Sequence, residues 1–539
     1  MSRPSLALTL LVLTVLSTSG LSQTPDGYQQ LLGVHEEYVK VRQPRMSDAL
    51  PDYRPPAIES QKRAVDGLRK RLGAINPAAW PVPRRVDYLL VRAELDGLDF
   101  DHRVVRPWAR DPGLYVDAIA RLPYTSVPVP PDRLKQFQAQ LAAVPRFLTD
   151  ARTLLTSASG ELAGIAIRQL AQSDGINQGE PRRAVPPAGI VGWYTDLIDR
   201  LPQHHSELVN DARQALIATQ GFHRWLVENQ ASMKEPASVG LENYDWYLRN
   251  VRLMPFTARD VRQLGLREEG RARTFLEIEE HRNRALPPMQ PVTSEAEHTR
   301  RVQEAETHIR EFMKKHDLMT IPPDAPAEFE TDAFWIVRPG GKRHFWEELT
   351  YRDPRNNHIH ASIPGHQFDG LVQRRNANPI RRNYRDGARS EGWGFYIEEM
   401  FLQAGLLDNL PRAKELFYIA QLKRAIRIPC ELNMQTGEFT LQQAIDHMVG
   451  EVPLMEPDLA RYDLAIYLRR PTYGMNYFMG KIQLEQLLSD RALQLGNKFD
   501  LGRFHDEFLA AGPIPISLTR WEMTGLDDQV KTLWATATQ

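Results

Sequence analysis

The chain has 539 residues, of which 42% are hydrophobic and 25% are charged. This composition is typical of a globular protein and argues against intrinsic disorder. Lysine and arginine number 67 against 68 acidic residues, so the net charge of -1 gives no electrostatic reason to bind nucleic acid or an anionic membrane. We therefore expect no nucleic-acid partner and favour a small substrate that is uncharged or of mixed charge.

The first residues predict an export signal. Arg3 gives a positive start, Leu6 to Leu16 form an apolar run, and Gly20-Leu21-Ser22 offers small residues for cleavage. At about eleven residues the run is too short to cross a bilayer, which takes roughly 20. We expect residues 1–22 to be a cleaved signal peptide, the mature protein to be periplasmic or secreted, and no integral membrane span to remain.

Helical patterns dominate the rest of the chain. Residues 132–156 place apolar side chains three and four positions apart, as an amphipathic helix requires. Three pairs resemble capping pairs that open helices: Thr257 with Asp260, Ser294 with Glu297, and Thr440 with Gln443. The patterns predict a mainly α fold, with one helical region over residues 23–235 and a second over 236–539.

Strand-like patterns are confined to two short stretches, Ala333 to Val337 and His344 to Thr350. Both precede a histidine-rich segment at residues 358–366. We therefore expect a small β element near any site that these histidines form.

Several kinds of catalytic site find no support in the sequence. The only cysteine, Cys430, lies in an apolar, helix-like stretch, which predicts a buried side chain and excludes both a disulfide framework and a thiolate metal site. No phosphate-binding loop, dinucleotide-binding glycine turn or G-x-S-x-G elbow is present. Nothing local therefore supports a nucleotide-driven enzyme, a dehydrogenase or a serine hydrolase.

The histidine-rich segment has the character of a metal site. It reads His358-Ile-His360-Ala-Ser-Ile-Pro-Gly-His366, and Glu391 follows in the stretch Ser-Glu-Gly-Trp-Gly-Phe-Tyr. Two histidines and one glutamate are the ligands of many catalytic zinc sites, in which a fourth position stays open. The alternative is a loop whose histidines only cap helices and form hydrogen bonds.

The spacing of the two histidines bears on this choice. On an unbroken helix His360 and His366, six residues apart, would point about 120° away from each other. They can converge only where the backbone departs from the helix. Pro364 and Gly365 allow that departure, because proline removes a helical hydrogen bond and glycine tolerates unusual dihedral angles.

These motifs resemble those of the bacterial family called domain of unknown function 885, whose members show H-E-x-x-P-G-H-H and, further along, E-G-W-A-L-Y. Four more stretches are similar to motifs of this family: residues 106–112, 241–244, 255–258 and 471–477. The resemblance covers most of residues 90–490. It implies a largely helical, zincin-like (gluzincin-type) fold related to metallopeptidases, and we expect a peptide or another small molecule as substrate.

The resemblance also implies roles for individual residues. His360, His366 and Glu391 match the ligands of a Zn²⁺ ion, and Tyr477 matches a tyrosine that could steady an oxyanion. The chain departs from the family pattern at three places. Ala361 stands where the family has glutamate, Gln367 replaces the final histidine, and Thr472-Tyr473 replace Gly-Gln.

The alanine at position 361 bears directly on mechanism. In a zinc peptidase the glutamate at this position takes a proton from the attacking water, a contribution of about 10²–10⁴-fold. Alanine has no group that can do so. Four residues could substitute as the base: Glu347, Glu348, Glu398 and His358. With Tyr477, we single out Glu348 and Glu398 as candidate catalytic residues.

Three functions remain open from the sequence. The first is an exported zinc-dependent hydrolase, peptidase-like, with a displaced base. The second is a catalytically inactive descendant that binds metal, peptide or a partner. The third is a metal-assisted reaction in which no water has to be deprotonated.

Overall fold

The structure is a computed structural model, and it describes residues 26–173, 185–331 and 333–535. The predicted signal peptide at residues 1–22 lies outside these ranges. The described chain is built almost entirely from helices, as the sequence predicts. Only four of its residues form strands, β1 (Met46–Ser47) and β2 (Leu50–Pro51), which pair antiparallel.

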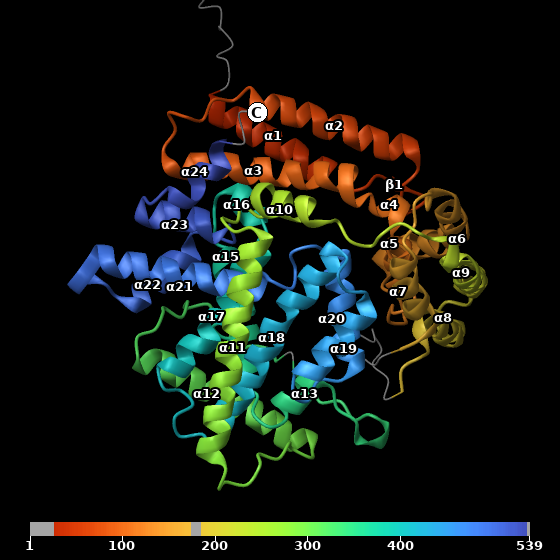
Figure 1. The fold of residues 1–539 in the computed structure, drawn as a ribbon. Coiled ribbons are helices and arrows are strands. Elements are labelled where there is room, and N and C mark those ends of the chain that lie inside the picture. Colours follow the sequence, from red (N-terminus) through yellow and green to blue (C-terminus); the bar gives the residue numbers. More distant parts are fainter. Residues whose placement is uncertain (1–25, 174–184, 332, 536–539) are drawn as a thin grey trace, which may run out of the picture.

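Three long helices from the start of the chain lie side by side along one edge of the molecule (Figure 1). They are α1 (Gly27–Val41), α2 (Pro55–Gly73) and α3 (Val82–Phe100). Their apolar faces share a core with α16 (Pro379–Asn383) and with two helices from the other end of the chain, α23 (Ile516–Thr524) and α24 (Asp528–Ala535). The two ends of the described chain therefore meet in one core.

The next group of helices builds a core of its own, seen at the right of Figure 1. A π-helical turn at Asp101–Val105 leads into it. Its α-helices are α4 (Pro107–Arg110), α5 (Pro112–Ala120), α6 (Pro131–Leu154), α7 (Gly160–Ala171), α8 (Gly189–Arg200) and α9 (Val209–Asn229). Short 3₁₀ turns occur at Leu201–Gln203, Ser206–Leu208 and Gln230–Ser232. The predicted helix at residues 132–156 corresponds to α6 and is confirmed.

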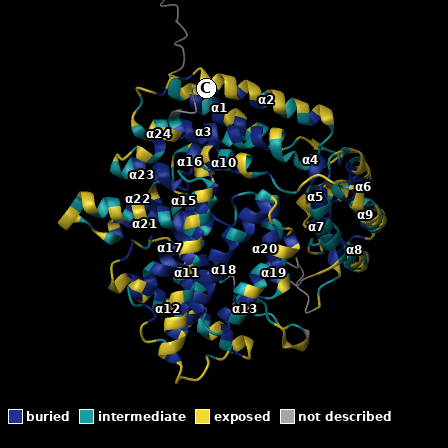
Figure 2. Cartoon of the chain, in the orientation of Figure 1, coloured by how far each residue is buried: buried dark blue, intermediate teal, exposed yellow. Residues whose placement is uncertain are grey.

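The remaining helices surround a third core, which is the largest, and a smaller fourth core. They are α10 (Leu241–Asn250), α11 (Ala258–Asn283), α12 (Glu295–Lys315), α13 (Phe345–Thr350), α14 (Arg355–Ala361), α15 (His366–Gln373), α17 (Gly387–Gln403), α18 (Ala413–Thr436), α19 (Leu441–Glu451), α20 (Pro457–Arg469), α21 (Asn476–Leu495) and α22 (Leu501–Ala510). Two 3₁₀ turns, Pro339–Gly341 and Gly496–Lys498, complete the set. Helices α17 and α18 are buried along most of their length (Figure 2).

The three predicted capping pairs open helices α11, α12 and α19. Thr257 and Asp260, like Thr440 and Gln443, cap each other reciprocally, and Ser294 accepts a hydrogen bond from the backbone N–H of Glu297. Each pair satisfies backbone donors that the first turn of a helix leaves free. The helix starts predicted from these pairs are confirmed.

The prediction of a small β element near the histidines is wrong. Residues 345–350 form helix α13, because the Glu347 carboxylate accepts a hydrogen bond from the backbone N–H of His344 at 3.0 Å and caps the first turn. Residues 333–337 form no strand either. The Tyr351 hydroxyl donates to the carbonyl of Phe334 at 3.0 Å and accepts from the N–H of Ile336 at 2.8 Å, which replaces a strand partner.

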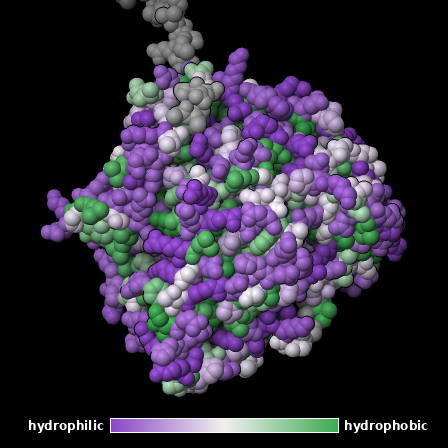
Figure 3. Space-filling model, viewed as in Figure 1, coloured by the Kyte–Doolittle hydropathy of each residue, from purple (hydrophilic) through white to green (hydrophobic). Residues whose placement is uncertain are grey.

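Figure 3 shows the hydropathy of one face of the molecule. Polar side chains cover most of that face, and apolar ones are scattered among them. Within the described residues no helix combines the length and the apolar character needed to cross a bilayer.

Candidate metal centre

His360 and His366 lie on two separate helices. His360 belongs to the last turn of α14, and His366 opens α15. The break between them depends on Gly365, since a Cβ atom there would lie 1.8 Å from the backbone carbonyl oxygen of His360. The indole Nε1 of Trp393 donates to the carbonyl of Pro364 at 2.9 Å and ties the break to α17. The interruption that the spacing of the histidines required is present.

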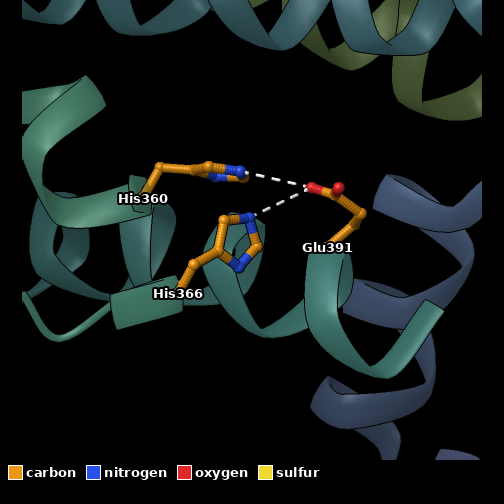
Figure 4. Close-up of side chains that lie close together, drawn as sticks. All are labelled: His360, His366 and Glu391. Atoms are coloured by element: carbon orange, nitrogen blue, oxygen red, sulfur yellow. Dashed lines mark ion pairs between the residues drawn. The ribbon is translucent and has the colours of Figure 1, made fainter. Parts of the chain in front are cut away.

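Glu391 reaches the two histidines from the first half of α17 (Figure 4). Its Oε2 lies 3.3 Å from Nε2 of His360 and 3.4 Å from Nε2 of His366. One ligand atom from each of the three residues lies within 4.8 Å of the others. The structure thus brings together the three residues that the sequence singled out as metal ligands.

The cluster fits a bound cation. Oε2 of Glu391 is buried and makes no directional hydrogen bond, although two imidazole nitrogens face it. Burial alone would raise the pKa of Glu391, but protonated His360 and His366 imidazoles outweigh it and hold the pKa far below its usual range. A cation bound between the three groups would take the place of these imidazole protons, and two imidazoles with one carboxylate are a donor set that Zn²⁺ prefers.

The other nitrogen of the His360 ring is occupied by Glu398. Nδ1 of His360 lies 2.6 Å from Oε1 of Glu398, whose side chain is wholly buried. Arg424, on α18, donates to both oxygens of that carboxylate, at 2.8 and 3.2 Å. Because an ionised carboxylate only accepts hydrogen bonds, the proton of the ring belongs on Nδ1 and the lone pair on Nε2. Glu398 therefore orients His360 rather than facing the centre of the cluster.

Glycine at position 394 leaves the room in which the His360 ring lies. A Cβ atom on this residue of α17 would be 2.8 Å from Cε1 of that ring. Helix α17 also approaches α21 closely, since a Cβ on Gly480 would lie 1.9 Å from the carbonyl oxygen of Ala388. Small residues thus allow α17 to bring Glu391 and Glu398 to opposite edges of one imidazole.

Tyr477 lies beside the cluster at the start of α21. Its ring stacks on that of His360 with a centroid separation of 6.1 Å. Burial, together with the Glu391 carboxylate, raises the pKa of the Tyr477 phenol well above its ordinary value. The hydroxyl therefore keeps its proton at neutral pH, as a hydrogen-bond donor to an oxyanion must.

The turn before Tyr477 is held by Glu431 of α18. Its Oε2 accepts from the backbone N–H of Met475 at 2.9 Å, and its Oε1 accepts from the Tyr244 hydroxyl at 3.1 Å. A Cβ on Gly474 would lie 2.8 Å from Oε2, so the carboxylate and the turn fit closely together. This turn belongs to the stretch 471–477 that the sequence resemblance singled out.

The other candidate bases have partners elsewhere. Glu348 pairs with Arg352 and Arg343, the second at 3.7 Å. Glu347 pairs with Arg338, and the buried His358 pairs with Glu306 on α12. Ala361 is 8% exposed and brings no polar atom. The structure thus joins Tyr477 and Glu398 to the cluster and places Glu347, Glu348 and His358 in ion pairs.

Sequence reasoning missed the polar side chains that α18 contributes. The helix-like stretch around Cys430, expected to be apolar, contains Lys423, Arg424, Arg427 and Glu431, all of which are buried. Charged residues at positions i, i+3 and i+7 of an otherwise apolar helix share one face, which was the available signal. Ser390, whose Oγ lies 3.3 Å from Nδ1 of His366, was also missed.

The fold and the cluster together describe a mainly helical protein with a two-histidine, one-glutamate centre. A model of the family described as "Bacterial protein of unknown function (DUF885)" matches residues 28–331 and 292–523. The chain therefore belongs to this family, and the resemblance seen in its motifs is confirmed. It matches no curated protein.

Two solved structures share the fold. One is a candidate lipoprotein of unknown function from Shewanella oneidensis, with a TM-score of 0.72 and 16% identity over 93% of this chain and 100% of that chain. The other is a candidate lipoprotein from Colwellia psychrerythraea, with a TM-score of 0.69 and 16% identity over 93% of this chain and 98% of that chain.

Proposed function

We propose that the protein is an exported, zinc-dependent hydrolase of the peptidase type, in which His360, His366 and Glu391 hold the metal. The observation that supports this most directly is the buried Oε2 of Glu391, which faces two imidazole nitrogens and has no hydrogen-bond partner. Zinc bound there would act as a Lewis acid toward a carbonyl group and would make water more acidic.

The surrounding residues have tasks that do not depend on which water or base is used. Glu398 keeps the lone pair of His360 on Nε2, and the ion pair with Arg424 holds Glu398 in place. Tyr477 retains its proton and can donate it in a hydrogen bond to the oxygen on which negative charge develops. These roles suit hydrolysis of an amide or ester.

A second function is favoured by one specific observation. Ala361 brings no base, and Glu347, Glu348 and His358 are held in ion pairs with other residues. A protein that binds metal and peptide without turnover would look the same. The two functions make opposite predictions for hydrolysis and the same prediction for metal binding.

Export is part of the proposal. The apolar run after Arg3 supports it, and so does the similarity to two structures described as candidate lipoproteins, a class of envelope protein. A periplasmic or secreted location would follow. N-terminal sequencing of the protein purified from a cell envelope or medium checks this, and a mature chain that begins near Gln23 is expected.

Metal analysis combined with a peptide-library hydrolysis assay tests the activity. The expected result is about one zinc per chain, together with cleavage that a chelator abolishes and added zinc restores. Stoichiometric zinc without cleavage would favour the non-catalytic function. Failure of the protein to hold zinc when it is offered would exclude both.

A further inference from the structure

Arg427 is a buried cation with unused hydrogen-bond donors next to the metal centre. It lies on α18 and is 4% exposed. Its Nη2 donates to Oδ2 of Asp463 on α20 at 2.9 Å, whereas its Nε and Nη1 have no hydrogen-bond partner. Unsatisfied buried donors on a guanidinium cost free energy, so a bound acceptor would explain them.

The Tyr477 ring contacts both the Arg427 guanidinium and His360, one of the proposed metal ligands. Cζ of Arg427 is 4.4 Å from the centroid of the Tyr477 ring, and that ring stacks on His360 with centroids 6.1 Å apart. One residue of extended peptide spans about 3.3–3.6 Å. If the cluster holds a peptide carbonyl, a group one or two residues further along the peptide is therefore far enough away to reach Arg427.

The charges on this side of the cluster do not balance. Three buried cations, Lys423, Arg424 and Arg427, are paired with only two carboxylates. Glu398 serves Arg424, while Lys423 and Arg427 share Oδ2 of Asp463, at 2.7 and 2.9 Å. Burial, with repulsion from Arg427, lowers the pKa of Lys423 to about 7, so its amine is only partly protonated at neutral pH. The region keeps an excess of positive charge of less than one unit.

A cavity of about 220 Å³ lies on the far side of Tyr473, and Asp101 lines it together with arginines. Its lining includes Tyr473, Arg470 and Arg252. The Tyr473 ring stacks on that of Tyr467 with centroids 5.9 Å apart, and Cζ of Arg427 is 5.6 Å from the Tyr467 centroid. Tyr473 thus lies between the Arg427 region and a cavity that several arginines line. Arg470 is exposed, so a ligand in that cavity could reach it.

We propose that Arg427, assisted by Arg470, binds the free C-terminal carboxylate of the substrate. A guanidinium matches a carboxylate in charge and geometry, and such pairs are among the strongest hydrogen bonds in proteins. The inference rests on the proposed function and narrows its substrate class to peptides cut one or two residues from the C-terminus. In that reaction water adds its hydroxyl to the carbonyl carbon, the C–N bond breaks, and the leaving amine takes the proton.

The test compares two peptides that differ only in the terminal group. N-acetyl-trialanine with a free carboxylate and the same peptide as its carboxamide are titrated by calorimetry into the full chain, both as purified and after chelation of metal. The carboxylate is expected to bind about 10- to 100-fold more tightly than the carboxamide in both preparations. Binding to the chelated protein separates this inference from hydrolysis.

Variants show which residues give the preference for the free carboxylate over the carboxamide. Arg427→Met should remove this preference, Arg427→Lys should keep part of it, and Arg470→Ala should weaken it. Arg382→Ala deletes an exposed positive charge on α16 and serves as the matched control, with no change expected. Circular dichroism checks the fold of the Arg427 variants, and the exposed position of Arg470 keeps the test decisive if they unfold.

The outcomes are distinct for the two proposals. Equal affinity for the two peptides, or no binding of either to the wild-type chain, overturns the inference about Arg427. Equal rates of hydrolysis for the two peptides overturn it as well, but are compatible with the proposed zinc hydrolase. A preference for the carboxylate in a protein without hydrolytic activity supports the binding site and contradicts the proposed catalysis.

Discussion

Oε1 of Glu398 lies 2.6 Å from Nδ1 of His360, while Nε2 of the same ring lies 3.3 Å from Oε2 of Glu391. One imidazole is thus held between two carboxylates that stand two turns apart on α17. The carboxylate of Glu398 also pairs with Arg424. In metal centres, such outer partners set the orientation and basicity of the ligand.

Replacing Glu398 with glutamine should therefore weaken zinc binding without removing a ligand. We expect the affinity to fall about 10- to 100-fold, because the amide no longer fixes the proton of His360 on Nδ1. Competition with a chromogenic chelator measures the change. Glu277→Gln, the same substitution at an exposed site on α11, is the control. Equal affinities in the two variants would contradict the orienting role.

His366→Ala should remove most of the bound zinc. The variant keeps one imidazole and one carboxylate, which is too few ligands for a stable site. Because His366 is only partly buried, the helical content should be nearly unchanged by circular dichroism. His281→Ala, on the exposed face of α11, should keep its zinc. Retention of stoichiometric zinc by His366→Ala would mean that the metal binds elsewhere.

Ala361→Glu tests whether catalysis lacks only its base. If the site is otherwise competent, the new carboxylate should raise peptide hydrolysis by at most about 10²–10⁴-fold. If another residue already acts as base, the gain should be small, and charge repulsion with Glu391 could even lower the rate. His360→Ala should abolish activity in either background. Activity that survives loss of both His360 and His366 would place the chemistry elsewhere in the chain.

Gly394→Ala tests how closely α17 fits the metal ligand. The added methyl would lie 2.8 Å from Cε1 of His360, so the ring must move away from its position between the carboxylates. We expect weaker zinc binding and a stability loss of about 1–3 kcal/mol. Gly270→Ala in α11, where a Cβ meets nothing within 4 Å, should instead stabilise by about 0.5–1 kcal/mol. Unchanged zinc affinity in Gly394→Ala would show that the ring is free to shift.

Glu431 should make stability depend on pH. Burial raises its pKa to about 7 against the hydrogen bonds from Met475 and Tyr244. Between its ordinary pKa of 4.5 and about 7 the folded chain binds a proton that the unfolded chain has released, so stability falls as pH rises through this range. Glu431→Gln should remove this loss, which amounts to at most about 3 kcal/mol. Urea unfolding at several pH values measures it.

The control for this prediction is Glu438→Gln, at an exposed position just beyond α18. Its stability should follow the wild type at every pH. A wild-type stability that is flat, or that rises, between pH 4.5 and 7 relative to Glu431→Gln would show that the carboxyl stays ionised in the fold.

The approach of His360 to His366 could be predicted because its sequence signal is local. His360, Pro364-Gly365 and His366 lie within seven positions, and the need for a helix break between the histidines follows from helix geometry alone. The capped helix starts were predictable for the same reason. The proposed division into regions 23–235 and 236–539 stays a prediction.

The features that could not be predicted depend on residues far away in the sequence. Residues 344–350 alternate as a strand would, but the carboxylates of Glu347 and Glu456 accept from the N–H groups of His344 and Phe345 and start a helix. Glu456 is more than a hundred positions away. The roles of Arg424 and Arg427 likewise depend on Glu398 and Asp463, which other helices bring to α18. Pattern reasoning along one segment has no access to such pairs.

The core that joins α1–α3 to α23 and α24 has a consequence for the order of folding. Roughly 400 residues separate the end of α3 from the start of α23, and a ribosome needs on the order of tens of seconds to make them. During that time the apolar faces of the first helices lack their final partners and remain open to chaperones. Closing so long a loop also slows folding after release. The nascent chain is thereby kept from reaching its compact state early, which is the condition in which a polypeptide can still be threaded through a translocation pore.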